Sequence, residues 1–269
     1  MRSNIFRLGI ILTASWLALA AFSKARPVLY IIGDSTVATG ASNNPIQGWG
    51  GELINLFDTT RINIQNRAVS GTSTRTYLSK GVHDKNMLKN GMWDSILVTL
   101  HAGDFVIMQF GHNDESAVVD STRMRGTIKG TGNDSITVFN PLLNRTETVH
   151  SYGWYLEKIT TAIRKHGATP IICSPIPKNF WKNGKVIRND NNYGKWASDI
   201  AQKNHVFFVD LNRMVADIYD AEGQGKVDSL YFVKDHIHNT RSGARLNAML
   251  VARALKQQHK PNLVNYLKK

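Results

Sequence analysis

The stretch Val28-Leu29-Tyr30-Ile31-Ile32-Gly33-Asp34-Ser35-Thr36 changes abruptly from apolar to polar residues. Runs of β-branched and aromatic residues bounded by Gly and Asp are typical of a buried strand that ends in a tight turn. Ser35 is therefore expected at the tip of a strand, where the scaffold fixes its hydroxyl. A serine hydroxyl needs a neighbouring base before it becomes a nucleophile. A Gly-Asp-Ser turn without chemistry is the simpler interpretation of this tripeptide taken alone.

Four further strands are predicted, and helical patterns separate them. The strands are expected at 61–69, 104–110, 169–173 and 206–210, and the helices at 49–57, 87–100, 151–167, 193–201, 214–219 and 242–257. Strands that alternate with helices predict right-handed crossovers and a parallel sheet with helices on both faces. The segment 115–150 has weak periodicity, and a connection of this length is usually functional or mobile. Its bases Arg123, Arg125 and Lys129 could bind the carboxylates of an acidic sugar, although solvated loop bases are commoner.

The chain has 269 residues, of which 42% are hydrophobic, and this is enough for one sizeable core. Arg2 and Arg7 precede an uncharged apolar stretch that ends near Phe22, and small residues suited to cleavage follow it. We therefore expect residues 1–25 to be a secretory signal peptide and residues 26–269 to be one domain. The apolar stretch is short for a bilayer span, so no stable membrane anchor is expected after cleavage. The protein is predicted to be secreted or periplasmic.

The formal net charge is +13, and loss of Arg2, Arg7 and Lys24 with the signal peptide lowers it by three, to +10. A basic exported protein suits an acidic polymer or an anionic surface, although scattered solvated lysines explain the charge equally well. Export and the lack of a basic-aromatic binding motif argue against nucleic acid. The single cysteine, Cys173, lies in an apolar run and is expected to be a core residue, so no disulfide framework forms.

Three polar turns are predicted to meet at one edge of the sheet. Ser35, Gly71 and Asn113 follow the first, second and third predicted strands. Ligands of open α/β sheets bind outside the carboxyl ends of the strands, so these turns can share one crevice. There the N–H groups of Ser35 and Gly71 and the amide of Asn113 could stabilise an oxyanion. Taken singly, Asn113 is more simply a turn asparagine.

A base for Ser35 is expected near the C-terminus, in Asp235-His236-Ile237-His238. If this stretch makes one helical turn, Asp235 and His238 lie on the same side, and His236 on another. Asp235 could then hold the His238 ring while the other ring nitrogen faces Ser35. The pair His236 and His238 could instead present two metal ligands. No His-Glu-x-x-His motif or cysteine cluster completes such a site, so neither a metal nor a cofactor is expected.

These residues resemble the four ordered blocks of the SGNH (GDSL) hydrolases. The matching blocks are Gly33-Asp34-Ser35, Gly71, Gly111-His112-Asn113-Asp114 and Asp235-x-x-His238. Within that superfamily, the third and fourth blocks and residues 147–156 are similar to the rhamnogalacturonan acetylesterase branch. The resemblance implies a flavodoxin-like, three-layer α/β/α sandwich with a five-stranded parallel sheet. It also implies Ser35 as nucleophile, His238 as base, Asp235 as its partner, and an oxyanion hole formed by Ser35, Gly71 and Asn113.

The function expected from this resemblance is that of an exported serine esterase. Its substrate would be an acetylated acidic polysaccharide or oligosaccharide, most simply the rhamnogalacturonan part of pectin. The alternatives are a xylan acetylesterase, a lipase or a thioesterase of the same fold, and a polysaccharide-binding protein without turnover. His112 is expected either to touch the substrate or to face solvent.

Overall fold

A five-stranded parallel sheet forms the centre of the computed structural model, which describes residues 25–79, 92–258 and 261–269. Its order is β2-β1-β3-β6-β9. The strands are β1 (Val28–Gly33), β2 (Asn63–Asn66), β3 (Phe105–Gln109), β6 (Thr169–Cys173) and β9 (Phe207–Val209). All neighbours pair in parallel, so the predicted sheet is confirmed. Residues 1–24 of the predicted signal peptide and the first part of the predicted 87–100 helix lie outside the described residues.

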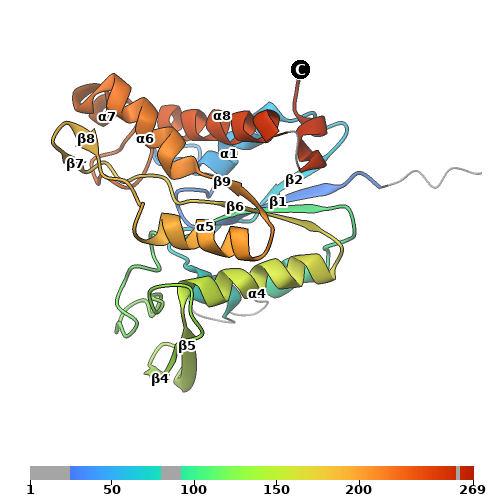
Figure 1. Ribbon diagram of the computed structural model, residues 1–269, viewed down its shortest axis with the longest axis vertical. Helices are drawn as coiled ribbons and strands as arrows, with labels where there is room; N and C mark the ends of the chain where they lie inside the picture. Colours follow the sequence, from blue (N-terminus) through green and yellow to red (C-terminus); the bar gives the residue numbers. More distant parts are fainter. Residues whose placement is uncertain (1–24, 80–91, 259–260) are drawn as a thin grey trace, which may run out of the picture.

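Helices cover both faces of this sheet and complete the predicted three-layer sandwich (Figure 1). One face carries α1 (Trp49–Leu53), α6 (Leu211–Glu222), α7 (Gln224–Leu230) and α8 (Arg241–Gln258). The other carries α2 (Thr74–Leu78), α3 (Met92–Leu97), α4 (Tyr152–Lys165) and α5 (Tyr193–Lys203). Two 3-10 helices, η1 (Ile54–Leu56) and η2 (Asn262–Tyr266), lie beside the first group. Within the described ranges, no helix combines the length and apolar character needed to span a bilayer.

The side chains of β1 alternate between the two cores, as expected for a strand buried on both faces. Leu29 and Ile31 pack with the α1, α6 and α8 side, whereas Tyr30 and Ile32 pack with the α2 to α5 side. All four are at most 1% exposed. The continuous apolar run seen in the sequence therefore contributes side chains to the cores on both faces of the sheet.

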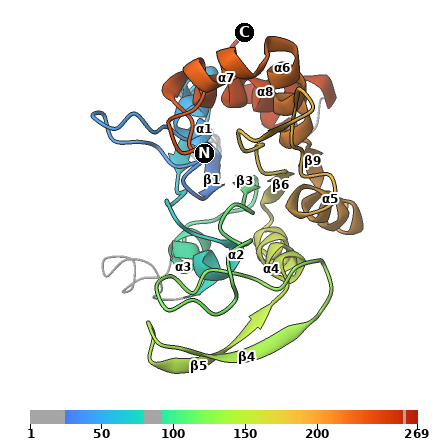
Figure 2. The ribbon, with the colours of Figure 1, turned by 90° about the vertical axis from the view of Figure 1, so that its left-hand side faces the viewer.

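The segment 115–150 contains a β-hairpin that the sequence did not predict. Strands β4 (Ser135–Asn140) and β5 (Arg145–His150) pair antiparallel and lie beyond α2 and α4, away from the central sheet (Figure 2). Most β4 side chains are exposed, so the hairpin carries little of the apolar pattern that identifies strands. Val138 and Val149 instead form a small separate core with Met124. The short hairpin of β7 (Trp181–Lys182) and β8 (Lys185–Val186) and the helix α7 were also not predicted.

A buried arginine on α2 fastens this segment to the rest of the protein. Arg75 is 1% exposed, and its Nη1 donates to the carbonyl oxygens of Val118 and Gly126, each at 2.8 Å. Its Nη2 forms an ion pair with Glu147 of β5, whose Oε1 also accepts from Asn140 Nδ2 at 3.1 Å. A buried charge is tolerated when it is paired and hydrogen-bonded. Arg75 therefore holds α2, the 115–127 loop and the hairpin together.

We expect Glu147→Gln to lower the free energy of unfolding by about 3 kcal/mol, because it leaves the Arg75 charge buried without a counterion. Urea unfolding followed by circular dichroism measures this loss. The control is Glu157→Gln, which breaks a surface pair whose Lys203 partner is 59% exposed; that change should lower stability by less than about 1 kcal/mol. Equal losses in the two variants would contradict a structural role for the buried pair.

Candidate active site

Ser35 lies in a tight turn directly after β1, as the sequence predicted. The chain enters this turn at Gly33, where a Cβ atom would lie 2.5 Å from the carbonyl oxygen of Gln109 and 2.6 Å from Val37 Cγ2. The Asp34 carbonyl oxygen then accepts from the N–H groups of Val37 and Ala38, at 3.1 and 2.9 Å. Glycine is therefore needed for close packing of the turn against β3. The turn leaves Ser35 partly exposed at the carboxyl end of β1.

The acid of the same turn, Asp34, directly precedes Ser35 in the chain and is fully buried. Its Oδ1 accepts from the N–H and the Oγ1 of Thr36, at 2.9 and 2.7 Å. Thr36 Oγ1 accepts in turn from Gln109 Nε2 at 2.6 Å, and Gln109 Oε1 accepts from Trp49 Nε1 at 2.8 Å. Burial alone would raise the pKa of Asp34, but the interactions with His112 and Thr36 outweigh burial and lower it. Asp34 is thus held as a carboxylate that fixes the turn.

His112 is 5% exposed and reaches Asp34 from the turn after β3. Its Nδ1 lies 3.4 Å from Asp34 Oδ2, and its Nε2 lies 3.1 Å from the carbonyl oxygen of Ile176. A carbonyl oxygen only accepts, so Nε2 carries a hydrogen. Of the two expectations for His112, solvent contact is therefore wrong: the ring is mostly buried, at the edge of the crevice described below.

The structure brings His238 and Asp235 to Ser35. His238 Nε2 lies 2.8 Å from Ser35 Oγ, across 203 positions of sequence. On the other side of the ring, Nδ1 contacts Asp235 Oδ2. Partial burial would raise the pKa of Asp235, but hydrogen bonds from His238 and from the Ile237 N–H outweigh it and lower that pKa. Asp235 is therefore ionised and holds the ring with Nε2 toward the serine.

The helical turn suggested for this stretch does not form. Residues 235–238 make a bend in which His236 has a φ of +61°, and Asp235 Oδ1 accepts from the backbone N–H groups of Ile237 and His238, at 3.0 and 2.9 Å. A short acidic side chain that folds over its own following backbone is a common turn device. His236 points elsewhere, as expected, and its ring stacks with Phe180 at a centroid distance of 5.5 Å.

The three residues expected to supply N–H donors, Ser35, Gly71 and Asn113, line one pocket. Gly71 has a φ of +82°, and no atom lies within 4 Å of the position a Cβ would take. Its N–H and that of Ser35 donate to no acceptor in the part of the chain that the structure describes. Asn113 is 8% exposed, and its Nδ2 donates one hydrogen to the Thr72 carbonyl oxygen at 2.7 Å. That bond orients the amide and leaves its second hydrogen available.

The neighbour of Asn113 is a fully buried acid that links two turns of the site. Asp114 accepts from the N–H of Thr74, the first residue of α2, at 3.1 Å, and also from the Thr74 hydroxyl. Burial is the largest influence and raises the pKa of Asp114 to about 7, with a smaller contribution from Asp34, although the Thr74 hydrogen bonds lower it. The turn that carries Asn113 is thereby tied to the α2 N-terminus, which follows Gly71 in the chain.

These residues line one crevice of about 700 Å³. It contains Ser35, Ser70, Gly71, His112, Asn113, Glu115, Ser116, Thr122, Arg123, Arg125, Ile237 and His238. Of the three bases considered from the sequence, Arg123 and Arg125 line it and Lys129 does not. The two arginines and the Ser35 hydroxyl thus face the same space.

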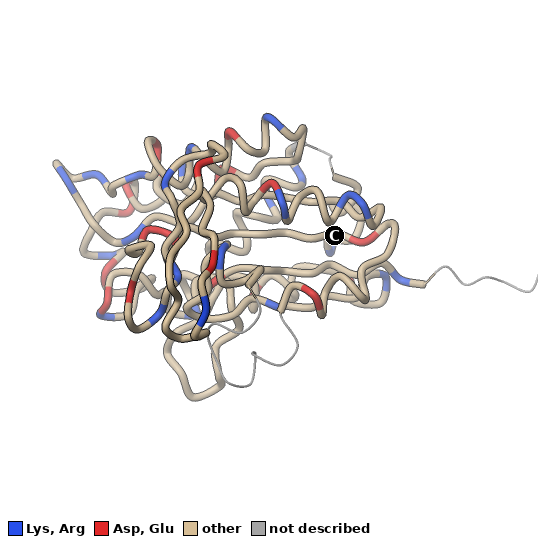
Figure 3. The backbone as a smooth tube through the Cα atoms, turned by 90° about the horizontal axis from the view of Figure 1, so that it is seen from below, with Lys and Arg blue, Asp and Glu red and all other residues tan. Residues whose placement is uncertain are grey.

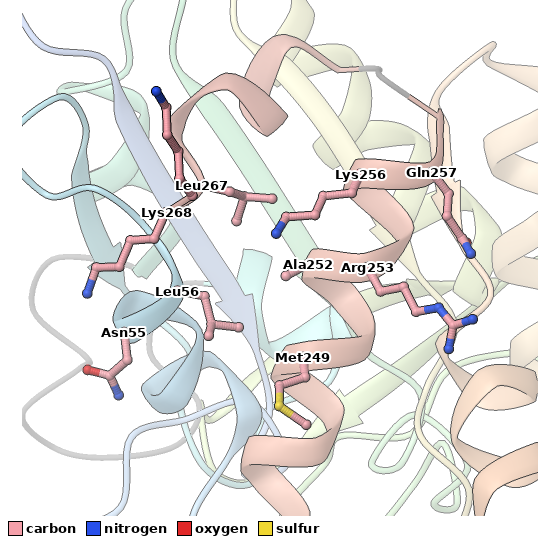
Figure 4. A pocket seen from close by; sticks show the side chains of 10 residues that line it. Asn55, Leu56, Met249, Ala252, Arg253, Lys256, Gln257, Leu267 and Lys268 are labelled. Atoms are coloured by element: carbon pink, nitrogen blue, oxygen red, sulfur yellow. The ribbon is translucent and has the colours of Figure 1, made fainter.

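A second hollow, of about 550 Å³, lies at the other end of the sheet, near the start of β1 and β2 (Figure 4). Its walls come from α8, η1 and the residues after η2, and they include Leu56, Met249, Arg253, Lys256 and Lys268. None of the predicted site residues lines it. The hollow offers basic side chains over an apolar floor, without a nucleophile and base in contact, so it is not the candidate active site.

The surplus of basic residues does not by itself mark a binding surface. In the view from below, lysines and arginines are interspersed with acidic residues along the chain (Figure 3). A scattered charge affects solubility and encounter more than it identifies a ligand. Within the described ranges, no group of three or more His, Cys, Asp and Glu side chains is placed to hold a metal ion.

A parallel α/β sandwich with a serine, a histidine and a carboxylate joined at the carboxyl edge of its sheet has the architecture of a hydrolase. Residues 31–246 match the GDSL-like lipase/acylhydrolase family. The chain belongs to this family, which confirms the resemblance to the SGNH hydrolases.

Two relatives support the closer resemblance to the rhamnogalacturonan acetylesterase branch. The rhamnogalacturonan acetylesterase of Emericella nidulans is 31% identical over 227 residues, which cover 84% of this chain and 83% of that protein. The probable rhamnogalacturonan acetylesterase YesY of Bacillus subtilis is 25% identical over 233 residues, which cover 85% and 92%. The crystal structure of the Bacillus subtilis protein YxiM shares the fold, with a TM-score of 0.66 at 20% identity over 87% of this chain and 57% of that one.

The raised pKa of Asp114 predicts a specific pH dependence of stability. Between the ordinary carboxyl pKa near 4 and about 7, the folded protein binds a proton at Asp114 that the unfolded chain does not. This group therefore adds stability at pH 4 that is lost as the pH rises through 7. Asp114→Asn should remove that contribution, so the stability difference between wild type and variant, measured by urea unfolding at several pH values, should change steadily between pH 4 and 7. A constant difference would contradict the raised pKa.

Proposed function

We propose that the protein is a serine esterase that hydrolyses acetyl esters on a plant cell-wall polysaccharide, with rhamnogalacturonan as its substrate. The observation that carries this proposal is the 2.8 Å contact between His238 Nε2 and Ser35 Oγ. The names of the two relatives supply the acetyl ester and the polysaccharide. A Ser–His–carboxylate chain beside free N–H donors suits acyl transfer, and these residues account for the reaction without a cofactor.

In the first step, Ser35 Oγ attacks the acetyl carbonyl carbon while His238 Nε2 takes the hydroxyl proton. Asp235 keeps the hydrogen on Nδ1 and stabilises the imidazolium that forms. The carbonyl oxygen becomes an oxyanion, to which the N–H groups of Ser35 and Gly71 and the Asn113 amide donate. Fixed donors of this kind stabilise the developing charge without having to reorganise.

In the second step, the tetrahedral intermediate expels the sugar oxygen, which takes the proton from His238. The acetyl group remains on Ser35 as an ester. Water then enters, gives a proton to His238 and attacks the acetyl carbonyl, and the same three donors hold the second oxyanion. Its collapse returns the proton to Ser35 Oγ and releases acetate, so that the site regains its starting state.

A polymeric cell-wall substrate lies outside the cytoplasm, which agrees with the export expected from the N-terminal sequence. We therefore also propose that residues 1–25 are a signal peptide and that residues 26–269 are exported as one catalytic domain. This proposal is supported by the Arg2 and Arg7 charges before the apolar stretch. N-terminal sequencing of the exported protein tests it, and a chain that still begins at Met1 would contradict it.

Ser35→Ala should lower acetate release by about 10³-fold or more, because it removes the hydroxyl that contacts His238 Nε2. The assay compares acetylated rhamnogalacturonan with acetylated xylan, and circular dichroism checks that the fold is intact. Ser42→Ala, at an exposed serine outside the crevice, is the matched control and should retain activity. Activity that survived in Ser35→Ala would refute the assignment of Ser35 as the nucleophile. A preference for acetylated xylan would contradict rhamnogalacturonan as the substrate.

Asn113→Ala should lower kcat by about 10²-fold, because it removes an oxyanion donor that acts mainly in the transition state. KM should change much less, since the ground-state ester carries little charge on its oxygen. Steady-state kinetics with a small acetate ester separates these two constants. A rise in KM with an unchanged kcat would mean that Asn113 only binds substrate.

A further inference from the structure

We propose that Arg123 and Arg125 form a carboxylate-binding subsite of the crevice, which takes the acid group of a uronate residue near the acetylated sugar. The inference rests on the proposed function, because it assumes that the ester lies at Ser35. In this proposal, the two arginine side chains select an acidic polymer over a neutral one.

Both arginines line the hollow that contains Ser35 and His238. Neither forms an ion pair with any residue that the structure describes. The acid that shares the crevice, Glu115, is already paired with Lys178. Both arginines thus line the substrate space, and no carboxylate among the described residues forms an ion pair with either.

The two arginines line one crevice, and their charges repel each other. Burial lowers the pKa of Arg125, and the charge of Arg123 lowers it further. The carboxylates of Asp120, Asp34 and Glu115 offset this lowering of the pKa in part. Like charges in a partly desolvated crevice reduce stability, and an anion bound between them removes that penalty. An anion bound in the crevice therefore interacts favourably with both charges.

The residue between the arginines fixes where they point. Met124 has a φ of +46°, a region that non-glycine residues rarely adopt. Its side chain is fully buried and packs with Val138 and Val149 of the hairpin. Because Met124 is anchored inward, the residues on either side of it are left at the surface of the crevice.

Arg125 is further positioned by its own hydrogen bond. Its Nε donates to Ser116 Oγ at 3.1 Å, and its two Nη groups bond to no acceptor among the described residues. The loop around it is pinned by Arg75, which donates to the carbonyl oxygens of Gly126 and Val118. Side chains that are ordered before binding lose less entropy when the ligand arrives.

The chemistry of the pair favours a carboxylate. A guanidinium group presents a planar fork of N–H donors that matches the two oxygens of a carboxylate. An acetylated sugar bound at Ser35 is linked to neighbouring sugars if it belongs to a polymer. Ser35 and the two arginines line the same crevice, so one substrate chain can contact both. A neutral polymer such as xylan offers nothing to this subsite.

The test compares an acetylated, uronate-containing oligosaccharide with the same oligosaccharide after methyl esterification of its carboxyl groups. Wild type should show a kcat/KM about tenfold higher for the free acid, expressed mainly in KM. The double variant Arg123→Gln/Arg125→Gln should lower this ratio to about one. Lys129→Gln, an exposed base of the same segment outside the crevice, is the control and should keep the wild-type ratio. High salt should lower the ratio in wild type, because it screens the pair.

The possible outcomes separate this subsite from the proposed function. If wild type releases acetate from both oligosaccharides at equal kcat/KM, the subsite is refuted and the esterase stands. If the double variant keeps the tenfold preference, other residues bind the carboxylate. If wild type hydrolyses neither oligosaccharide yet cleaves a small acetate ester in a Ser35-dependent way, the polysaccharide substrate is wrong and the subsite falls with it.

Discussion

The buried carboxylate of Asp34 is the constraint on which the arrangement of the site depends. A charge at this depth needs partners, and it finds them in Thr36 of its own turn and in His112 of the turn after β3. His112 then bonds to the Ile176 carbonyl oxygen, beyond the end of β6. The carboxyl ends of three neighbouring strands are in this way drawn onto one polar cluster, and Ser35 is held at its edge.

The partner of Ser35 comes from the far end of the chain, and a second buried polar residue fixes it there. Asn239, next to His238, is 1% exposed and accepts from Gln47 N–H at 2.9 Å. Its side chain donates to the Tyr231 carbonyl oxygen and accepts from Asn247 of α8, each at 2.9 Å. These bonds tie the histidine bend to α8 and to the segment before α1. The contact between Ser35 and His238 is thus set by packing on both sides.

The sequence predicted those parts of the protein whose signals are local. Each central strand is a short apolar run that ends in a polar turn, so the sheet and the meeting of Ser35, Gly71 and Asn113 could be anticipated. The spacing of Asp235 and His238 suggested that they pair, although the pairing arises from a bend and not from a helical turn. Long-range polar contacts leave no such pattern. The Arg75 to Glu147 pair and the hairpin it secures join residues 72 positions apart, and no periodicity marks them.

The residues assigned to bond breaking and those that face the rest of a substrate belong to different stretches of the chain. The former sit on turns of the central sheet, whereas Arg123 and Arg125 sit on an excursion that packs on its own small core of Met124, Val138 and Val149. The excursion is joined to the sandwich by Arg75 and by backbone hydrogen bonds of Thr127, Ile128 and Gly130. Insertions, deletions or substitutions in it can therefore accumulate during evolution without disturbing the Ser35 to His238 contact, so that one inherited chemistry can be refitted to differently charged polymers.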